Sequence, residues 1–151
     1  MIEIKRATLD KDTVEQLIKL SYLWEEEDIT FGLHHNTESN LKEPCYIALD
    51  NNEIVGYIFG HYYDNEKVVS NDEGGIPIGE KCFDIDEIYI KKEYRNQGIG
   101  KKLFDKLEEE VKHNCKWLTL PTSTKDYKKI LHFYSEVIGM TFHSAFLFKK
   151  C

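Results

Sequence analysis

The sequence lacks the features that would place the chain in a membrane, in a secretory pathway or on nucleic acid. Acids or bases interrupt every apolar run long before the roughly 18 residues that a membrane helix needs. The first six residues contain no apolar core of a signal peptide. Bases are outnumbered, 20 against 27 acids, and the net charge of −7 argues against a general nucleic-acid binder. The same charge mildly favours cationic partners.

The cysteines and histidines lack the spacing of a disulfide framework or a metal site. No CxxC pair is present, and the six histidines show no HxxxH spacing. The four cysteines are spread singly along the chain, at Cys45, Cys82, Cys115 and Cys151. We therefore expect no metal, free thiols and a reducing compartment, hence a cytoplasmic location.

The chain does contain the alternating patterns of one ordinary α/β domain. Its 151 residues suffice for one sizeable core, and no repeat, low-complexity stretch or linker divides them, so we expect one domain over residues 1–151. A first helix of about 12 residues is predicted from Asp12, which stands three residues before Glu15 as in a capping box. The other predicted helices cover residues 37–41, 98–111 and 126–137. Strands are predicted at residues 2–5, 44–49, 54–63, 82–90, 117–120 and 140–148, which implies a mixed sheet.

Two strand patterns have consequences for the site. The turn residues Asp50-Asn51-Asn52-Glu53 predict an antiparallel hairpin. In residues 82–90, strict alternation predicts two faces. One face would carry Phe83, Ile85, Glu87 and Tyr89, and the other Asp84, Asp86, Ile88 and Ile90. The loop over residues 64–81, with Gly74-Gly75 and Pro77, separates this strand from the hairpin, and Val68-Val69 could extend the hairpin edge.

The most informative stretch is the turn between this strand and the next helix. Gly98-Ile99-Gly100 opens a helix with a clean apolar stripe. Unpaired N–H groups and the positive end of the helix dipole favour an anion there, and glycine permits close approach. Arg95, Lys101 and Lys102 add positive charge around the turn. By itself such a turn also fits a plain strand–helix connection, and the fuller phosphate motifs GxxxxGK[ST] and GxGxxG are absent.

The segment Arg95-Asn96-Gln97-Gly98-Ile99-Gly100 resembles the Arg/Gln-x-x-Gly-x-Gly/Ala pyrophosphate loop of the GNAT N-acetyltransferase superfamily. The preceding strand, the downstream Phe133-Tyr134 pair and the element order extend the resemblance over the whole chain. It implies an α/β fold with a mixed, mostly antiparallel central sheet of six to seven strands and about four helices. It also implies an N-acetyltransferase with acetyl-CoA as cosubstrate.

The resemblance further implies roles for individual residues. The backbone of Ile88, Tyr89 and Ile90 would pair with the pantetheine arm. The pyrophosphate would lie on the loop residues Asn96, Gln97, Gly98, Ile99, Gly100 and Lys101, beside Arg95. Tyr134 would protonate the leaving thiolate, although a half-buried helical tyrosine is the alternative interpretation. Two departures stand out: Tyr127 occupies the place of a frequent cofactor-contacting Asn, and the spacing from Phe133-Tyr134 to Gly139 is one residue longer than usual.

Acetyl transfer to an amine requires a base, because an ammonium has no lone pair. Asp86 and Glu87 are the candidates, and Asp86 stands nine residues before the loop arginine, where polyamine-type relatives keep an acid. Both could instead be solvated strand-edge charges. No cysteine is placed to act as a covalent relay, so we expect direct transfer.

The acceptor is the least determined part of the function. The acidic run Glu25-Glu26-Glu27-Asp28, with the acids of the 82–90 strand, could form a mouth for a cationic small-molecule primary amine, or could be a solvated face. The sequence leaves open whether the acceptor is a polyamine, an aminoglycoside, an amino acid or a protein amine. It also leaves open whether the chain forms a homodimer. A non-catalytic acyl-CoA-binding module and a structural protein without coenzyme are the competing interpretations.

Overall fold

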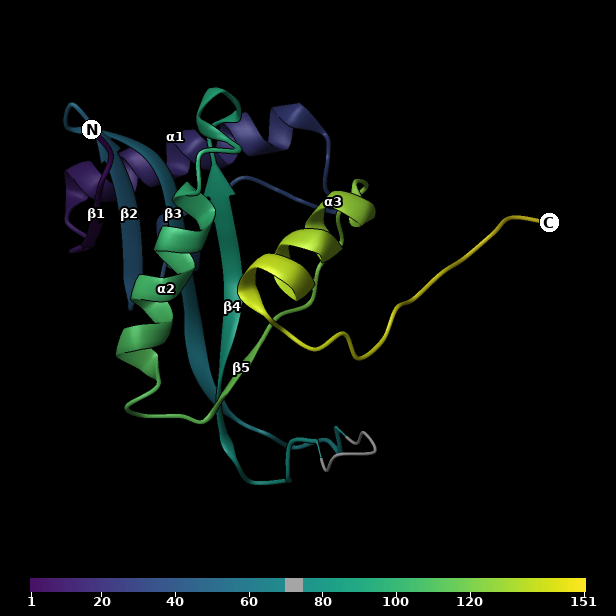
Figure 1. The fold of residues 1–151 in the computed structure, drawn as a ribbon. Coiled ribbons are helices and arrows are strands. Elements are labelled where there is room, and N and C mark those ends of the chain that lie inside the picture. The colour runs from purple at the N-terminus through teal and green to yellow at the C-terminus, as the bar shows by residue number, and fades with distance from the viewer. Residues whose placement is uncertain (70–74) are drawn as a thin grey trace.

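A mixed five-stranded sheet forms the centre of the molecule. The computed structural model describes residues 1–69 and 75–151. The strands are β1 (Glu3–Arg6), β2 (Cys45–Asp50), β3 (Glu53–Asp64), β4 (Lys81–Ile90) and β5 (Trp117–Thr119), and they lie side by side in this order (Figure 1). The first four pair antiparallel, whereas β5 runs parallel to β4. The α/β class and the mixed sheet are as predicted, but the prediction of six to seven strands is wrong for the described residues.

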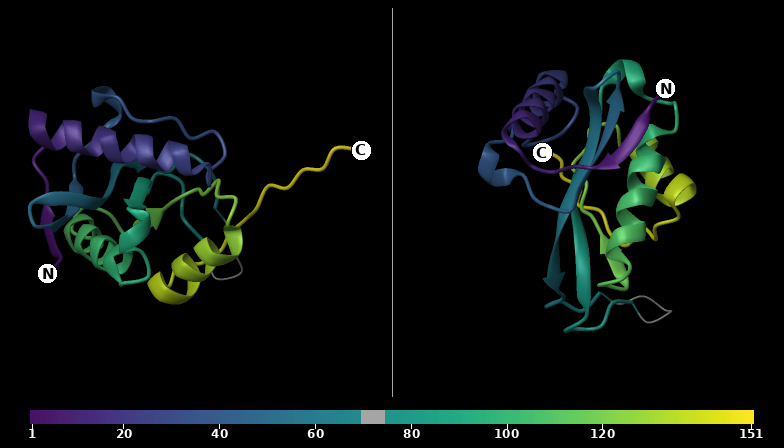
Figure 2. Two further views of the ribbon diagram at one scale, coloured as in Figure 1. Left: turned by 90° about the horizontal axis from the view of Figure 1, so that it is seen from above. Right: turned by 90° about the vertical axis from the view of Figure 1, so that its left-hand side faces the viewer.

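Helices cover both faces of the sheet. Helix α1 (Lys11–Glu27) lies on one face, and α2 (Ile99–Val111) and α3 (Tyr127–His132) lie on the other, as Figure 2 shows. Helix α3 continues as a π-helix, η3 (Phe133–Ile138), and two short 3₁₀ turns, η1 (Glu38–Asn40) and η2 (Lys92–Tyr94), complete the described elements. Three helices replace the predicted four, because residues 37–41 form only the 3₁₀ turn η1. Each face has its own apolar core, one under α1 and one under α2. No helix in the described ranges is both long and apolar enough to cross a membrane.

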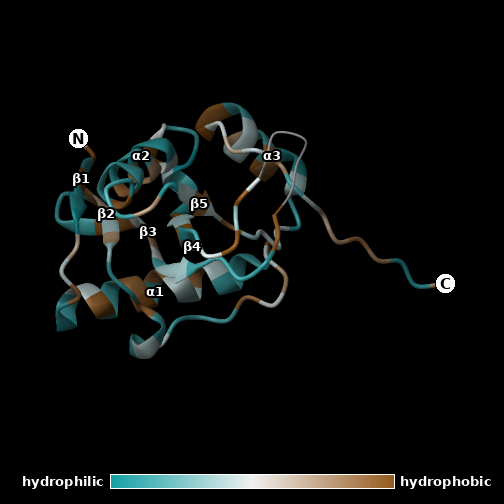
Figure 3. Ribbon diagram, turned by 90° about the horizontal axis from the view of Figure 1, so that it is seen from below, coloured by the Kyte–Doolittle hydropathy of each residue, from teal (hydrophilic) through white to brown (hydrophobic). Residues whose placement is uncertain are grey.

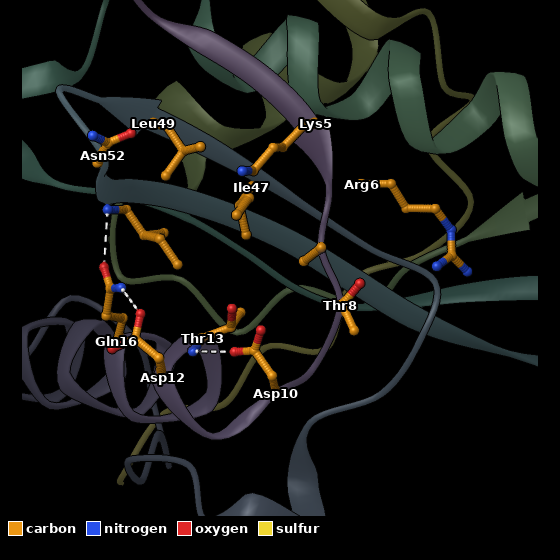
Figure 4. Close-up of a pocket in the computed structure, with 12 residues that line it drawn as sticks. Lys5, Arg6, Thr8, Asp10, Asp12, Thr13, Gln16, Ile47, Leu49 and Asn52 are labelled. Carbon is orange, nitrogen blue, oxygen red and sulfur yellow. Dashed lines mark hydrogen bonds between the residues drawn. The ribbon is translucent and has the colours of Figure 1, made fainter.

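Helix α1 is longer than predicted and begins at a different cap. It has 17 residues, and the side chain of Asp10, not Asp12, accepts a hydrogen bond from the backbone N–H of Thr13 at 2.9 Å. Asp12 instead accepts from Gln16, which in turn accepts from the backbone N–H of Ile54 in the hairpin (Figure 4). These residues line a hollow between β1, α1 and the β2–β3 hairpin that contains none of the predicted site residues.

The β2–β3 hairpin forms as its turn residues predict. Asn51 and Asn52 have φ of 48° and 67°. Both values lie in the left-handed region that asparagine tolerates and that the tight hairpin turns require. The turn chemistry is local, which explains why the sequence identified it.

A β-bulge in β4 overturns the predicted alternation of its side chains. Phe59 pairs with Glu87, but the next residue, Gly60, pairs with Ile85, so Asp86 is the extra residue. The side-chain faces therefore switch at Asp86: Phe83, Ile85, Ile88 and Ile90 all pack with the core under α2, whereas Tyr89 packs under α1. The predicted common face of Asp86, Ile88 and Ile90 is wrong. Gly60 permits the bulge, since a Cβ there would lie 2.0 Å from the carbonyl oxygen of Asp84.

The π-helix accounts for the unusual spacing after Phe133-Tyr134. A π turn contains more residues than an α turn, so a single inserted residue is accommodated without breaking the helix. Here Phe133–Ile138 is in the π conformation, and Gly139 ends it with φ of 87°. The predicted helix over residues 126–137 is thus confirmed in position, with its second half in this wider form.

The C-terminal segment differs from its prediction. Residues 139–151 form no strand, and the chain extends away from the sheet, with an apolar stretch visible in Figure 3. The side chains of Phe146, Leu147 and Phe148 are exposed. Strand β5, three residues long, offers little edge to pair with. In the predicted loop over residues 64–81, Val69 forms an isolated bridge with Ile76, while Gly74 lies outside the described residues.

Candidate active site

The central feature of the candidate site is a wedge between β4 and β5. The two strands pair only from Cys82 opposite Trp117 to Asp84 opposite Thr119. Beyond this point β4 continues to Ile90, paired with β3 on its other side, while the chain after β5 turns toward α3 (Figure 1). No strand of the described ranges pairs with this side of β4 after Asp84, so the backbone of Ile88, Tyr89 and Ile90 borders the wedge. An extended ligand could pair there as a strand would.

The N-terminus of α2 has the properties of an anion site. Gly98 is its N-cap, with φ of 76° and no side-chain cap, and the first turn holds no acid. The first N–H groups of a helix have no partner within it, here those of Ile99, Gly100 and Lys101. A Cβ on Gly98 would meet no described atom within 4 Å, so the turn is open on that side. These properties fit the pyrophosphate of acetyl-CoA, which would bring a reactive thioester to the wedge.

Arg95 is engaged inside the protein. Its guanidinium donates to Glu27 of α1 at 2.8 Å and to the carbonyl oxygen of Ile90 at 2.9 Å. The hydroxyl of Tyr89 donates to the same Glu27 oxygen at 2.6 Å, and Arg95 lies over the Tyr89 ring. Arg95 therefore fixes the turn against β4 and α1, and much of its charge is compensated. Lys101 donates to Asp105 at 2.5 Å, whereas Lys102 is exposed and has no ion pair with the described residues. The helix-end N–H groups and Lys102 are therefore the groups available to attract an anion.

Glu87 is a partly buried carboxyl group beside the wedge. Its Oε2 accepts hydrogen bonds from the hydroxyl of Tyr57 and from the side-chain amide of Asn36, each at 2.7 Å. Burial raises the pKa of Glu87 above its ordinary value, and these two bonds oppose the rise. The sequence predicted neither donor. Tyr57 has the pattern of an ordinary aromatic residue in a strand, and Asn36 is 51 residues away from Glu87 along the chain.

Asp86 lies in a more polar cluster. Its carboxylate is 2.9 Å from Nδ1 of His61 and 3.2 Å from Nζ of Lys42. Asp84 accepts from the hydroxyl of Thr119 at 2.6 Å, and burial raises the pKa of Asp84. Potential metal-ligand atoms of His61, Asp84 and Asp86 lie within 4.8 Å of one another. The lysine in the cluster shows that it accommodates an ammonium group.

Tyr134 lies in the π-helix, which packs beside α2. The neighbouring Phe133 ring contacts Tyr134 edge to face, with centroids 5.2 Å apart, and lies over Gly100 of α2. Burial raises the pKa of Tyr134 to about 12, so its hydroxyl keeps its proton at neutral pH. Within the described ranges, no side chain or backbone group hydrogen-bonds to this hydroxyl, and Tyr127 is exposed.

The acidic run at the end of α1 has mostly structural partners. Glu25 accepts from the backbone N–H of His35 at 2.7 Å and lies 2.6 Å from its ring Nδ1. Glu27 binds Arg95, and Asp28 pairs with Lys125 at 2.7 Å. These contacts fix the loop that follows α1 and leave Glu26 as the member with no partner among the described residues. A mouth of four free acids is therefore not what the structure contains.

The chain belongs to the acetyltransferase (GNAT) family, whose model matches residues 11–140. It is an acetyl-CoA-dependent acetyltransferase. An aminoglycoside acetyltransferase from an uncultured soil metagenomic sample, solved with sisomicin, is 19% identical, with coverage of 99% of this chain and 95% of that one and a TM-score of 0.67. No curated protein sequence gives a significant match.

Two further structures are similar. AAC(6')-Iy in complex with a bisubstrate analogue, CoA-S-monomethyl-acetylneamine, is 14% identical, with coverage of 100% and 99% and a TM-score of 0.65. A predicted acetyltransferase from Clostridium acetobutylicum, solved with acetyl-CoA, is 18% identical, with coverage of 99% and 96% and a TM-score of 0.65. At these identities the likeness establishes the fold.

The openness at Gly98 leads to a first prediction. Gly98→Val should raise the Kd of coenzyme A roughly tenfold or more, because methyl groups would block the approach to N–H groups whose bonds to a charged ligand are worth about 1.5–3 kcal/mol each. Gly79→Val is the matched control, since Gly79 also has positive φ and open space but lies in the β3–β4 loop. Calorimetric titration with coenzyme A gives the Kd for each of the two variants. Equal affinities in the two variants would remove Gly98 from the binding site.

Proposed function

We propose that residues 1–151 form one N-acetyltransferase domain that moves the acetyl group of acetyl-CoA directly to a primary amine of a cationic small molecule. The observation that carries this proposal is the partly buried, hydrogen-bonded Glu87, in the strand that borders the wedge and leads to the Gly98 turn. A pKa raised toward the working pH makes this carboxylate a stronger base than an ordinary glutamate. Glu87 would accept the proton that the substrate ammonium must lose before its nitrogen can attack the thioester carbonyl.

Asp86 is better suited to binding than to proton transfer. It is already in contact with two basic side chains, Lys42 and His61. Together with Asp84 it provides negative charge beside the wedge, which supports a cationic acceptor. Among proteins of this fold, one aminoglycoside acetyltransferase was solved with sisomicin. We therefore assign the base to Glu87 and attraction of the acceptor to Asp84 and Asp86.

Tyr134 would complete the reaction from the other face of the sheet. Its raised pKa keeps the hydroxyl protonated, as a proton donor to a leaving thiolate must be. Backbone groups of Ile88 to Ile90 would align the pantetheine arm, and a backbone N–H of this strand would stabilise the developing oxyanion. Acetyl-CoA supplies the activated acetyl group.

An amine panel with a free-thiol readout tests the proposal. Primary amines with two or more positive charges should release coenzyme A from acetyl-CoA, whereas neutral and anionic amines should do so poorly. Thermal shift with coenzyme A is the companion measurement, since a ligand at 100 times its Kd adds about 2.7 kcal/mol to stability. Stabilisation without turnover of any amine would point to a non-catalytic acyl-CoA-binding module.

The charge of the acceptor leads to a prediction about salt. The KM for the amine should rise with ionic strength, because salt screens exposed charges over about 8 Å under physiological conditions. Asp86→Asn should raise this KM several-fold with a smaller effect on kcat, as expected for lost ground-state attraction. Glu26→Gln, which makes the same charge change at an exposed position, is the control. An amine KM that responds neither to salt nor to Asp86→Asn would contradict a cationic acceptor.

A further inference from the structure

A chain of buried polar groups connects α1 to Glu87. The hydroxyl of Ser21 donates to the carbonyl oxygen of Ile18 at 2.7 Å and accepts from the backbone N–H of Asn36 at 2.8 Å. The side-chain amide of Asn36 then donates to Glu87 at 2.7 Å. Ser21 and Asn36 are only 2% and 5% exposed, and Tyr57, the second donor to Glu87, is fully buried.

Burial of polar groups is costly unless each has a hydrogen-bond partner. Here Ser21 pairs with Ile18 and Asn36, and the side chains of Asn36 and Tyr57 both donate to Glu87. Both donors use Oε2 of Glu87. Within the described ranges, no group hydrogen-bonds to Oε1, so one oxygen is fixed and the other stays available to accept a proton. Asn36 thereby sets the orientation of the carboxylate from outside the sheet.

The same residue anchors the loop between α1 and η1. At its start the loop is held to the segment after β5, where the backbone N–H of Phe31 donates to the carbonyl oxygen of Ser123 at 2.9 Å. At its end it is held by Asn36 and by the His35–Glu25 pair. Gly32 and His34 remain exposed between these anchors.

We propose that Asn36 is a positioning residue for catalysis, which holds Glu87 in its reactive orientation and ties the loop at residues 29–36 to it. The proposal rests on the function proposed above, in which Glu87 is the base. It assigns a role to a residue whose hydrogen bonds reach Ser21 and the side chain of Glu87, and neither the Gly98 turn nor the backbone of residues 82–90. A merely structural asparagine would lower stability when replaced but would leave the ionisation of Glu87 unaltered.

The ionisation of Glu87 is therefore the decisive measurement. Tyr57 and Asn36 act on Glu87 through hydrogen bonds, and Asp86 acts through its charge, which opposes the ionisation of Glu87. The charge of Asp86 is in turn next to Lys42 and His61. Because the Asn36 amide favours the ionised form, Asn36→Leu should raise the pKa of Glu87, by about one unit for the loss of one such bond. Tyr57→Phe should act in the same direction through the same oxygen.

The experiment is a carbon-13 NMR titration of the full chain labelled at glutamate carboxyl groups, with Glu87 assigned by its absence in Glu87→Gln. Asn65→Leu is the matched control, because Asn65 is also 5% exposed but bonds to backbone carbonyls of the β3–β4 loop. If Asn36→Leu does not fold, Asn36→Ala, which cannot overpack, takes its place. An upward shift of the Glu87 titration with the Asn36 variants but not with Asn65→Leu supports the proposal. Coincident titration curves for the Asn36 variants and wild type, or an equal shift with Asn65→Leu, overturn it.

Turnover provides an independent reading. With a reactive amine, the acid limb of the kcat/KM profile of Asn36→Leu should move to higher pH, whereas that of Asn65→Leu should stay in place. If no amine is acetylated, the proposed function fails, yet the titration still decides whether Asn36 controls Glu87. If turnover occurs but neither the titration nor the profile moves, only the role of Asn36 is wrong.

Discussion

Glu87→Gln is expected to lower kcat by roughly 10²- to 10⁴-fold, the usual contribution of a positioned general base. Glutamine keeps the shape of the side chain and an oxygen that accepts from Tyr57 and Asn36, so the fold should persist. It cannot accept the ammonium proton. Steady-state kinetics with a reactive amine measure the loss, and Asp86→Asn measured beside it identifies which of the adjacent acids is the base. A larger loss of kcat in the Asp86 variant would reverse the assignment.

The same substitution should not weaken the fold at neutral pH. Because the pKa of Glu87 is raised in the folded state, the folded protein binds more protons than the unfolded chain between the two pKa values. The stability from protonated Glu87 is fully present below its unfolded pKa and is lost as pH rises through the folded pKa. A glutamine at this position is neutral at every pH, so the variant does not lose stability as pH rises through this range. Denaturation of both proteins from pH 4 to pH 8 should show the variant gaining stability relative to wild type as pH rises. A variant that loses stability relative to wild type over this range would contradict a raised pKa of Glu87 in the folded protein.

Tyr134→Phe is expected to lower kcat by roughly 10- to 1000-fold, as for the loss of a proton donor. Coenzyme A affinity should stay nearly intact, because only the hydroxyl is removed and the ring contact with Phe133 is kept. The measurements are kcat with a reactive amine and the Kd of coenzyme A by calorimetry.

Tyr46→Phe is the matched control for Tyr134. Its pKa is likewise raised to about 12, but its hydroxyl donates to Glu110 of α2 at 2.8 Å, next to β1. Both changes remove one partly buried hydroxyl, and only the Tyr134 change should affect kcat. If the kcat of Tyr134→Phe stays within a factor of two of wild type, Tyr134 is a packing residue and not a proton donor.

Features encoded by neighbouring residues were predictable from the sequence. The hairpin turn at Asn51-Asn52 and the start of α2 after Gly98 depend on the φ preferences of a few adjacent residues. The family likewise follows from the contiguous motif at residues 95–100, confirmed by the match over residues 11–140. Even the longer Phe133-Tyr134 spacing was visible, although not its form as a π-helix.

Features that depend on distant partners were decided only by the tertiary structure. The bulge at Asp86 forms where β3 presents Gly60, and it makes Glu87 rather than Asp86 the less exposed carboxyl group. Asn36 reaches Glu87 across 51 residues, and Arg95 reaches Glu27 across 68. Periodicity within one strand carries no information about such contacts, because a bulge or an ion pair is stabilised by what the opposite element offers. The sequence by itself therefore determined the family, the hairpin and the glycine turn that begins α2, whereas packing between elements determined which acid is the less exposed and which side chains hold it.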